Sequence, residues 1–124
     1  MQHTISKKTL VLGASENPSR YSNRAIHMLR SIGHEVVAIG AEAGMVLDVE
    51  YDNQLKDFED IDTVTLYLNP KRQEPYFDYI ISLKPKRIIF NPGTENPVLE
   101  ELAEQNGIEA LEACTLVLLS TGQY

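Results

Sequence analysis

Several features are scarce in this sequence. It contains one cysteine, Cys114, and no tryptophan among its 124 residues. A single cysteine excludes an internal disulfide framework and fits a reducing compartment. No apolar run approaches the ~20 residues that a helix needs to cross a bilayer, and residues 1–8 lack the apolar segment of a signal peptide. We therefore expect a cytoplasmic protein without a membrane partner.

Positive charge is scarce as well. Lys and Arg number 11 against 18 Asp and Glu, which gives a formal net charge of −7. Nucleic-acid phosphates are held by clustered Lys and Arg, so this balance argues against a nucleic-acid partner. A small phosphorylated ligand is still compatible with it, because such a ligand needs only a local positive field.

Spacings typical of metal sites or catalytic sets are also missing. Neither C-x-x-C nor H-E-x-x-H occurs, and the three histidines His3, His27 and His34 are dispersed along the chain. None of them pairs with Cys114 at a recognisable spacing, so each is expected to be a surface or core histidine. The sequence therefore predicts no metal site and no catalytic residue.

What the chain does contain is an alternation of short apolar runs and amphipathic segments. Runs typical of buried strands lie at residues 10–12, 35–39, 63–68, 87–90 and 108–111. Between the first two runs, Ala25, Met28, Leu29 and Ile32 recur at helical spacing, and Gly33 follows as a helix C-terminal cap. Asn96 followed by Pro97 indicates another helix start.

This rhythm predicts one α/β domain over residues 1–124. We expect an open, doubly wound parallel sheet in the Rossmann-like order 3-2-1-4-5, with helices on both faces. Three stretches have weaker patterns. We expect a short extended piece at 45–47, one helical turn at 54–58, and a sixth short strand or a final turn at 114–119.

The loop after the first strand is the candidate binding site, because ligands of such sheets bind beyond the carboxyl ends of the central strands. Gly13 permits close backbone approach, Ser15 offers a hydroxyl, and Arg20 offers a planar fork suited to phosphate. Ser22 alone fits a helix N-cap, and Arg20 alone fits a solvated loop charge. Together these residues predict that a nucleotide phosphate lies at the helix N-terminus.

The usual dinucleotide fingerprint, G-x-G-x-x-G, is absent, and the loop is longer and has one glycine. An acid that binds ribose is expected at the end of the second strand, where only Glu42 is loosely placed. NAD is therefore compatible with the sequence but not indicated by it.

The stretch G-A-S-E-N-P-S-R-Y-S at residues 13–22 resembles the G-A-S-x-x-P-x-R-x-S opening of small stand-alone CoA-binding proteins. These are relatives of the nucleotide-binding domain of the succinyl-CoA synthetase α subunit. The resemblance covers nearly the whole chain and includes Gly33, Asn69-Pro70, the P-G-T-E-N stretch at 92–96, and Cys114. The synthetase takes its phosphorylated histidine from a further domain that this chain lacks, so ligase activity is not implied.

The resemblance implies a binding role for particular residues. Gly13, Ala14 and Ser15 would hold the pyrophosphate of CoA, with Arg20 and Ser22 assisting. Gly40 and Ala41 would lie by the adenosine, Asn69 and Pro70 would border the adenine or pantetheine path, and Gly93 belongs to the similar P-G-T-E-N stretch.

One departure from the family concerns the end of the second strand. The family often has Asn-Pro-Lys where this chain has Gly40-Ala41-Glu42, and that lysine suits the 3′-phosphate of CoA. Glu42 would repel this phosphate unless its side chain turns away. Lys71 and Arg72 could supply compensating charge or could be a solvated helix start. A ligand without the 3′-phosphate, such as an adenine mononucleotide or dinucleotide, is the alternative.

Cys114 has two interpretations, a buried small hydrophobe or a thiol that faces the pantetheine thiol and forms a mixed disulfide with CoA. We expect CoA or acyl-CoA binding without catalysis, because no acid–base or nucleophile pair can be assembled. One alternative is a small enzyme, either an NAD(P)-dependent oxidoreductase or a CoA-transferring protein. The other is a regulatory module that binds AMP or another nucleotide and docks on a partner, with residues 114–119 as a homodimer edge.

Overall fold

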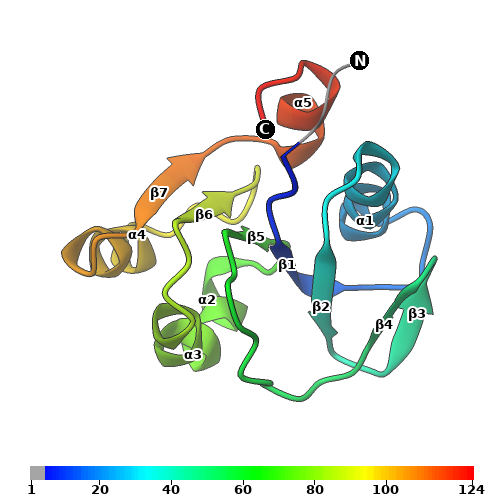
Figure 1. Ribbon diagram of the computed structural model, residues 1–124. Coiled ribbons are helices and arrows are strands. Elements are labelled where there is room, and N and C mark those ends of the chain that lie inside the picture. The colour runs from blue at the N-terminus through cyan, green and yellow to red at the C-terminus, as the bar shows by residue number, and fades with distance from the viewer. Residues whose placement is uncertain (1–4) are drawn as a thin grey trace.

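The computed structural model describes residues 5–124, and a five-stranded parallel sheet forms its centre (Figure 1). All five strands were expected from the apolar runs, within a residue or two at each end. They are β1 (Thr9–Ala14), β2 (Val36–Gly40), β5 (Thr63–Leu66), β6 (Arg87–Phe90) and β7 (Glu109–Glu112). The predicted α/β fold class is confirmed.

The strand order was predicted wrongly. The sheet reads β2-β1-β5-β6-β7, which is 2-1-3-4-5 for its strands in chain order, and not 3-2-1-4-5. After β2 the chain forms a hairpin of β3 (Gly44–Val46) and β4 (Val49–Tyr51), whose exit runs along the outer edge of β2 through an Ile39–Asp52 bridge. The next strand, β5, pairs with the free side of β1, so the winding reverses between β1 and β5.

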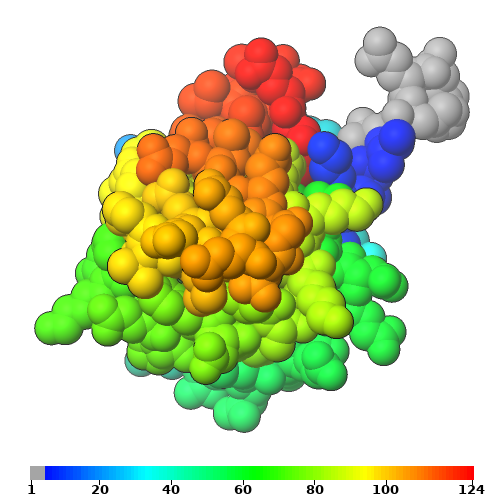
Figure 2. All heavy atoms as spheres, turned by 90° about the vertical axis from the view of Figure 1, so that its left-hand side faces the viewer, coloured from blue at the N-terminus to red at the C-terminus, as the bar shows by residue number. Residues whose placement is uncertain are grey.

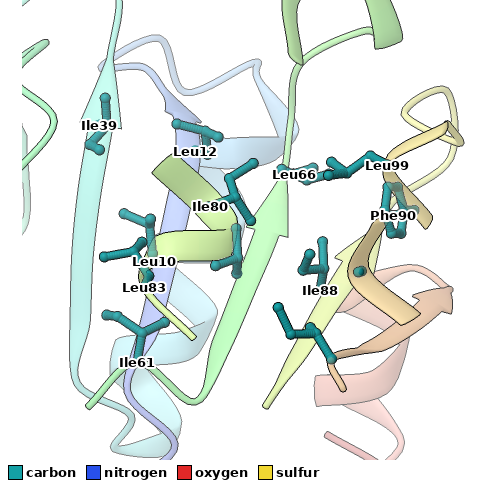
Figure 3. Packing of buried hydrophobic residues seen from close by; sticks show 13 residues of the cluster. Leu10, Leu12, Ile39, Ile61, Leu66, Ile80, Leu83, Ile88, Phe90 and Leu99 are labelled. Atoms are coloured by element: carbon teal, nitrogen blue, oxygen red, sulfur yellow. The ribbon is translucent and has the colours of Figure 1, made fainter. Parts of the chain in front are cut away.

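Helices cover both faces of the sheet, as expected. Helices α1 (Tyr21–Ile32) and α5 (Thr115–Ser120) lie on one face, and α3 (Phe77–Ser82) and α4 (Pro97–Gln105) lie on the other (Figure 1). Strand side chains alternate between the two layers. Leu10 and Leu12 lie in the same layer as Ile80 and Leu83 (Figure 3), whereas Val11 packs under α1.

Helix boundaries follow the capping residues of the sequence. Gly33 ends α1 with φ 103°, and its N–H donates to the carbonyls of Leu29 and Arg30. Asn96 caps α4 through its side-chain oxygen, which accepts from the N–H groups of Val98 and Leu99 at 3.2 and 3.3 Å, and Pro97 takes the first helical position.

One of the weaker patterns was interpreted wrongly. Residues 54–58 form no helical turn, because the N–H groups of Lys56 and Phe58 bond to carbonyls two residues back. For residues 114–119 a sixth strand or a final turn was expected; the strand is wrong, because residues 115–120 form the short helix α5, which packs on α1. The extended piece expected near 45–47 is present as β3.

The chain connects β5 to α3 through α2 (Pro70–Gln73) and the 3-10 turn η1 (Glu74–Tyr76), which accommodates Pro75 in its first turn. On the surface seen in Figure 2, the segment of α4 and β7 lies between the α2–α3 segment and α5. No helix within residues 5–124 is long and apolar enough to cross a membrane.

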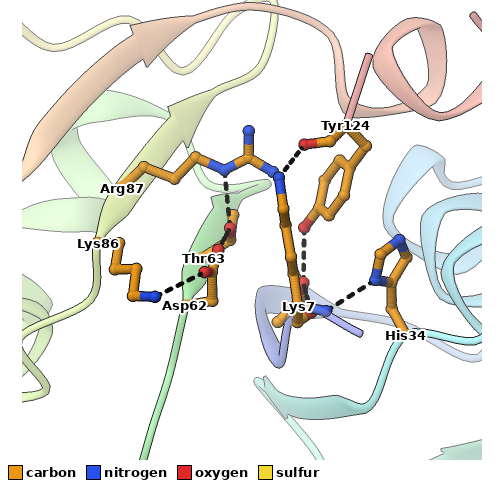
Figure 4. Close-up of polar contacts among 8 residues, drawn as sticks. Lys7, His34, Asp62, Thr63, Lys86, Arg87 and Tyr124 are labelled. Carbon is orange, nitrogen blue, oxygen red and sulfur yellow. Dashed lines mark hydrogen bonds and ion pairs between the residues drawn. The ribbon is translucent and has the colours of Figure 1, made fainter. Parts of the chain in front are cut away.

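Tyr124 packs against the amino ends of β1 and β6 (Figure 4). Its hydroxyl and the Thr9 hydroxyl are 2.6 Å apart, and its main-chain carbonyl accepts from Lys7 Nζ at 2.6 Å. Its ring lies 4.4 Å from the Arg87 guanidinium and 4.9 Å from the His34 ring. These contacts tie the residues before β1 and those after α5 to one edge of the sheet.

Candidate functional site

A cleft of about 410 Å³ opens at the opposite edge, where the carboxyl ends of β1 and β5 diverge. This is the point at which the winding of the sheet reverses, the usual ligand position of such folds. Its lining comes mainly from the loops after β1, β5 and β6. The lining residues are Gly13, Ala14, Ser15, Arg20, Tyr21, Ser22, Ala41, Tyr67, Leu68, Asn69, Arg72, Pro92, Gly93 and Thr94.

Gly13 shapes the floor of the cleft. Its φ is 103°, and a Cβ at this position would lie 2.9 Å from the Tyr67 carbonyl oxygen and 3.2 Å from Leu68 Cδ2. The pairing of β1 with β2 is irregular here, between Leu12 and Ala14. Only glycine lets the chain leave β1 in this direction while β5 passes so closely.

The loop from Ser15 to Arg20 is held by its own polar side chains. Asn17 N donates to Ser15 Oγ at 3.1 Å, and Asn17 Oδ1 accepts from Ser19 N at 3.0 Å and Ser19 Oγ at 2.8 Å. Asn23 Nδ2 donates to the Ser15 carbonyl at 3.0 Å, which ties the loop to α1. The loop backbone therefore has a defined shape before any ligand arrives.

Helix α1 begins at the cleft without a side-chain cap. Arg20 occupies the N-cap position with φ −82° and ψ 141°, and its side chain makes no capping bond. The expected cap, Ser22, instead lies inside the first turn, is 3% exposed and faces the cleft lining. The first N–H groups of this helix are therefore available to an anion.

Two guanidinium groups border the cleft from different loops. Arg20 lies on the loop after β1, and Arg72 lies on α2, where its N–H donates to Asn69 Oδ1 at 2.9 Å. Both side chains are exposed, and neither forms an ion pair within residues 5–124. A protein with net charge −7 thus has a locally positive site.

A fully buried glutamine holds the far rim in place. Gln73 Nε2 donates to the carbonyls of Leu68 and Thr94, each at 2.8 Å, and Gln73 Oε1 accepts from Asn96 Nδ2 at 3.0 Å. One side chain therefore links the loops after β5 and β6. No local pattern indicates this role, because Gln73 stands in a run of polar residues.

A smaller groove of about 210 Å³ continues from the cleft toward α5. Cys114 lies in its wall, half-buried at the N-cap position of α5, so it is not a core residue. The groove shares three aromatic or apolar lining residues with the cleft, namely Tyr21, Tyr67 and Pro92. The structure thus brings Cys114 to the same end of the sheet as the Gly13 loop.

Tyr67 contributes its ring to both hollows, and its hydroxyl lies in the interior. This oxygen is buried and has no hydrogen-bond partner within residues 5–124. Burial raises the pKa of Tyr67 to about 12, although the nearby Thr65 and Thr115 side chains act in the opposite direction. The neighbouring buried groups bond to one another: Asn91 Nδ2 donates to Thr65 Oγ1 at 2.7 Å, and Asn91 Oδ1 accepts from Thr115 N at 2.8 Å.

Two recesses adjoin the cleft at the end of β2. The first, of about 320 Å³, is largely apolar and is lined by Gly13, Ile39, Gly40, Ala41, Leu68, Arg72, Pro75 and Tyr76. The second, of about 230 Å³, lies on the hairpin side and is lined by Ala14, Ser15, Glu16, Asn17, Ala41, Glu42, Ala43 and Tyr51. Both recesses share lining residues with the cleft.

Most residues chosen from the sequence meet in this region. Gly13, Ala14, Ser15, Arg20, Ser22, Ala41, Asn69 and Gly93 line the cleft, Gly40 lines the apolar recess, and Cys114 lines the groove. Pro70 and Lys71 do not line these hollows, and Lys71 is exposed on α2. Tyr21 and Tyr67 were missed, although each directly adjoins a strand or loop that the sequence had marked as part of the site.

The histidines lie away from the cleft. His27 is exposed on α1, His34 is buried beside Tyr124 at the opposite edge, and His3 lies outside the described residues. Within residues 5–124, no three His, Cys, Asp or Glu side chains are grouped so as to hold a metal ion.

Several known proteins are similar to this chain in sequence and fold. A family model described as a CoA binding domain matches residues 7–120. A search of curated proteins found no significant match. The crystal structure of an uncharacterized protein is 50% identical, with a TM-score of 0.94, over 98% of this chain and 100% of that one.

Two further structures extend the comparison. A hypothetical protein from Pyrococcus horikoshii OT3 is 26% identical, with a TM-score of 0.80, over 94% of this chain and 83% of that one. An acetyl-coenzyme A synthetase from Ca. Korarchaeum cryptofilum, solved with phosphate and ADP, is 21% identical, with a TM-score of 0.69. The match covers 86% of this chain but 25% of the synthetase, and it shows a shared fold.

Proposed function

Because this chain belongs to the family of CoA-binding domains, we propose that its cleft binds CoA or an acyl-CoA through the ADP portion, without catalysis of its own. One observation carries the proposal. The uncapped N-terminus of α1, the Gly13 turn and the guanidinium groups of Arg20 and Arg72 all border one cleft at the β1–β5 switch point.

The pyrophosphate has a natural place in this arrangement. Free N–H groups at the start of α1 donate to phosphate oxygens, and the helix dipole favours the negative charge. Arg20 and Arg72 can each bond two phosphate oxygens through the guanidinium fork. Because Gly13 has no side chain, the ligand can approach its backbone closely. The chain just after β5 already does so on the protein side.

The two ends of the ligand would extend from the pyrophosphate in different directions. The apolar recess offers Leu68, Pro75 and Tyr76 as surfaces for the adenine ring. The groove toward α5 offers Tyr21, Pro92 and the Cys114 thiol to the pantetheine arm. Its modest volume, about 210 Å³, suits an extended arm and a small acyl group.

The composition of the cleft supports binding without chemistry. Its lining contains no His, Asp, Glu or Lys, and its ionisable groups are two arginines and two tyrosines. Arginine stays protonated, and burial raises the pKa of Tyr67 to about 12, so neither is suited to acid–base work near neutral pH. NAD(P) or AMP as the ligand of a small oxidoreductase or regulatory module is the competing proposal.

Isothermal titration and thermal shift with CoA, acetyl-CoA, dephospho-CoA, NAD, NADP and AMP test the proposal. At 100 times the dissociation constant a ligand stabilises by roughly 2.7 kcal/mol, which raises Tm by several degrees in a domain of this size. We expect CoA-type ligands to produce this shift and to be recovered chemically unchanged. A shift with AMP or NAD alone would favour the competing proposal, and no shift at all would contradict both.

Two charge-neutralising variants sharpen that measurement. Arg20→Gln is expected to weaken binding by about tenfold, the scale of one lost charge-assisted hydrogen bond. Lys84→Gln removes an equally exposed cation from the opposite edge of the sheet and is expected to leave affinity unchanged. Equal losses in the two variants would point to a general charge effect and not to a bond from Arg20.

The position of Cys114 adds a covalent test. We propose that its thiolate attacks CoA disulfide, forming a mixed disulfide with one CoA while the other CoA leaves as a thiolate. Mass spectrometry after incubation should locate a single CoA adduct at Cys114, and Cys114→Ala should show none. An excess of AMP should slow the reaction if the nucleotide end binds first. Absence of an adduct at Cys114 would contradict this step alone.

Location and assembly complete the proposal. The single cysteine supports a reducing, cytoplasmic location. Val117, 53% exposed on α5, and the edge strand β7 offer a surface for a homodimer. Gel filtration with light scattering distinguishes a monomer from a dimer, and a monomer at all accessible concentrations would contradict the homodimer.

A further inference from the structure

The recess on the hairpin side of the cleft has an unusual charge for a phosphate-binding neighbourhood. It lies at the carboxyl end of β2 and shares Ala14, Ser15 and Ala41 with the cleft. Its ionisable lining residues are Glu16, Glu42 and Tyr51, and it contains no Lys, Arg or His. The cations of the site, Arg20 and Arg72, line the cleft and not this recess.

The carboxylate of Glu16 is fixed in position. Its Oε2 accepts from the N–H of Met45 at 3.0 Å, at the first strand of the hairpin. Gly44 packs against it so closely that a Cβ there would lie 2.8 Å from Glu16 Cγ and 2.6 Å from the Tyr51 hydroxyl. Glu16 therefore loses its bond to the hairpin if its carboxylate turns away from the recess.

Glu42 approaches the same space from the loop after β2. Both carboxylates are near the Tyr51 phenol: burial raises the pKa of Tyr51 first, and the charges of Glu16 and Glu42 raise it further. The cations that pair with residues in and just after the hairpin are engaged elsewhere: Arg30 with Asp48 at 2.7 Å and Lys56 with Asp52 at 3.5 Å. Negative charge in the recess is thus not neutralised by a lining cation.

Carboxylates at this position discriminate between two kinds of ribose. The free 2′- and 3′-hydroxyls of a ribose donate hydrogen bonds to an acid at the end of the second strand. A phosphate on that ribose carries about two negative charges near neutral pH and would face two carboxylates at short range. The first arrangement gains bonds, whereas the second combines like charges without a counter-ion.

We propose that Glu16 and Glu42 are specificity-determining residues of the proposed CoA site, and that they select a ligand whose adenosine ribose carries free hydroxyls. The preferred class is then a CoA-type nucleotide without the 3′-phosphate, as in dephospho-CoA. This inference rests on the proposed function, because it assumes that the pyrophosphate occupies the cleft beside α1.

Isothermal titration of the wild-type protein with CoA and dephospho-CoA tests the inference directly. Dephospho-CoA is expected to bind about 5- to 30-fold more tightly at low salt, and the preference should shrink as salt screens the carboxylates. Equal binding, or tighter binding of CoA, would overturn the inference while leaving the proposed function in place. Binding of neither nucleotide would overturn the proposed function and the inference together.

Variants of Glu42 assign the preference to a residue. Glu42 is exposed, so Glu42→Gln and Glu42→Lys are expected to fold. The affinity ratio of dephospho-CoA to CoA should fall several-fold in Glu42→Gln and approach or pass unity in Glu42→Lys. Glu101→Gln, a matched change on the exposed side of α4, should keep the wild-type ratio. A ratio that stays at the wild-type value in both Glu42 variants would overturn the role of this residue.

Discussion

The two ends of the parallel strands, here called the amino edge and the carboxyl edge of the sheet, differ in how their polar groups are bonded. At the amino edge, Tyr124 bonds to both Lys7 and Thr9 (Figure 4), beside a hollow of about 560 Å³ that Lys8, Glu35 and Lys86 help to line. At the carboxyl edge, Arg20, Arg72 and the first N–H groups of α1 border an open cleft. Groups that pair internally contribute to stability, whereas groups left facing solvent in a fixed frame are available to a ligand.

At the carboxyl edge, the residues that hold the loops in place are not the residues that line the cleft. Gln73 and Asn91 bond to backbone groups of neighbouring segments and hold the loops around the cleft, but they do not line it. One polar atom at the amino edge is not bonded internally: Arg87 Nη2 is buried without a hydrogen-bond partner within residues 5–124. Its guanidinium lies 4.4 Å from the Tyr124 ring, so a cation–π contact stabilises that charge.

The largest effect on stability is expected at Gly13, which belongs to strand β1 and also lines the cleft. Gly13→Ala combines a strained positive φ with a contact at 2.9 Å from the Tyr67 carbonyl, so the free energy of unfolding should fall by roughly 2–4 kcal/mol. Gly107→Ala is the control, because Gly107 has φ +72° but nothing within 4 Å of a Cβ. Urea denaturation of both variants measures the difference, and equal losses would show that φ alone sets the cost.

The next largest effect on stability is expected at the amino edge. Tyr124→Ala removes the ring that Arg87 and His34 contact and should lower the free energy of unfolding by about 1–3 kcal/mol. Its ligand affinity should stay at the wild-type value, because Tyr124 lies at the edge opposite the cleft. Denaturation and titration on one sample check both parts, and a tenfold loss of affinity would break the separation of the two edges.

Local chemistry explains which parts of the fold were predictable from the sequence. Gly33 and Asn96 act through neighbours in the chain, so their capping roles were visible in the sequence, as was the Gly13 loop. The strand order depends on whether residues 41–52 cover the edge of β2, which is a choice between distant pairings. Gln73 and Tyr67 acquire their roles only when separate loops meet, and no local pattern marks such a meeting.

A smaller effect is expected from His34, through pH. Burial lowers the pKa of His34, helped by the nearby Lys7 and Arg87 cations and opposed by Asp62, and the neutral ring accepts from the Lys7 N–H at 2.9 Å. Because the unfolded chain binds this proton more readily, stability should be constant above about pH 6.5 and fall as pH decreases below it. Chemical denaturation between pH 7.5 and 5 measures the slope.

Two variants assign that slope. His34→Gln keeps an acceptor but cannot titrate, so its stability should depend less on pH over this range than that of the wild type. His27→Gln, at an exposed position on α1, should retain the wild-type slope. A wild-type slope in His34→Gln would mean that another group is responsible, and the amino edge would then not be sensitive to acid through this histidine.

The smallest effect tests the two edges with one chemical change, the removal of a phenolic oxygen. Tyr124→Phe loses the 2.6 Å bond to Thr9 and should destabilise by about 1 kcal/mol. Tyr67→Phe removes a buried hydroxyl that has no partner within residues 5–124, so it should be neutral or stabilise by up to about 1 kcal/mol. The urea midpoint should therefore fall in Tyr124→Phe and stay or rise in Tyr67→Phe. A clear loss of stability in Tyr67→Phe would reveal a hydrogen-bond partner for this oxygen. Polar groups at the carboxyl edge would then be bonded within the protein as those at the amino edge are.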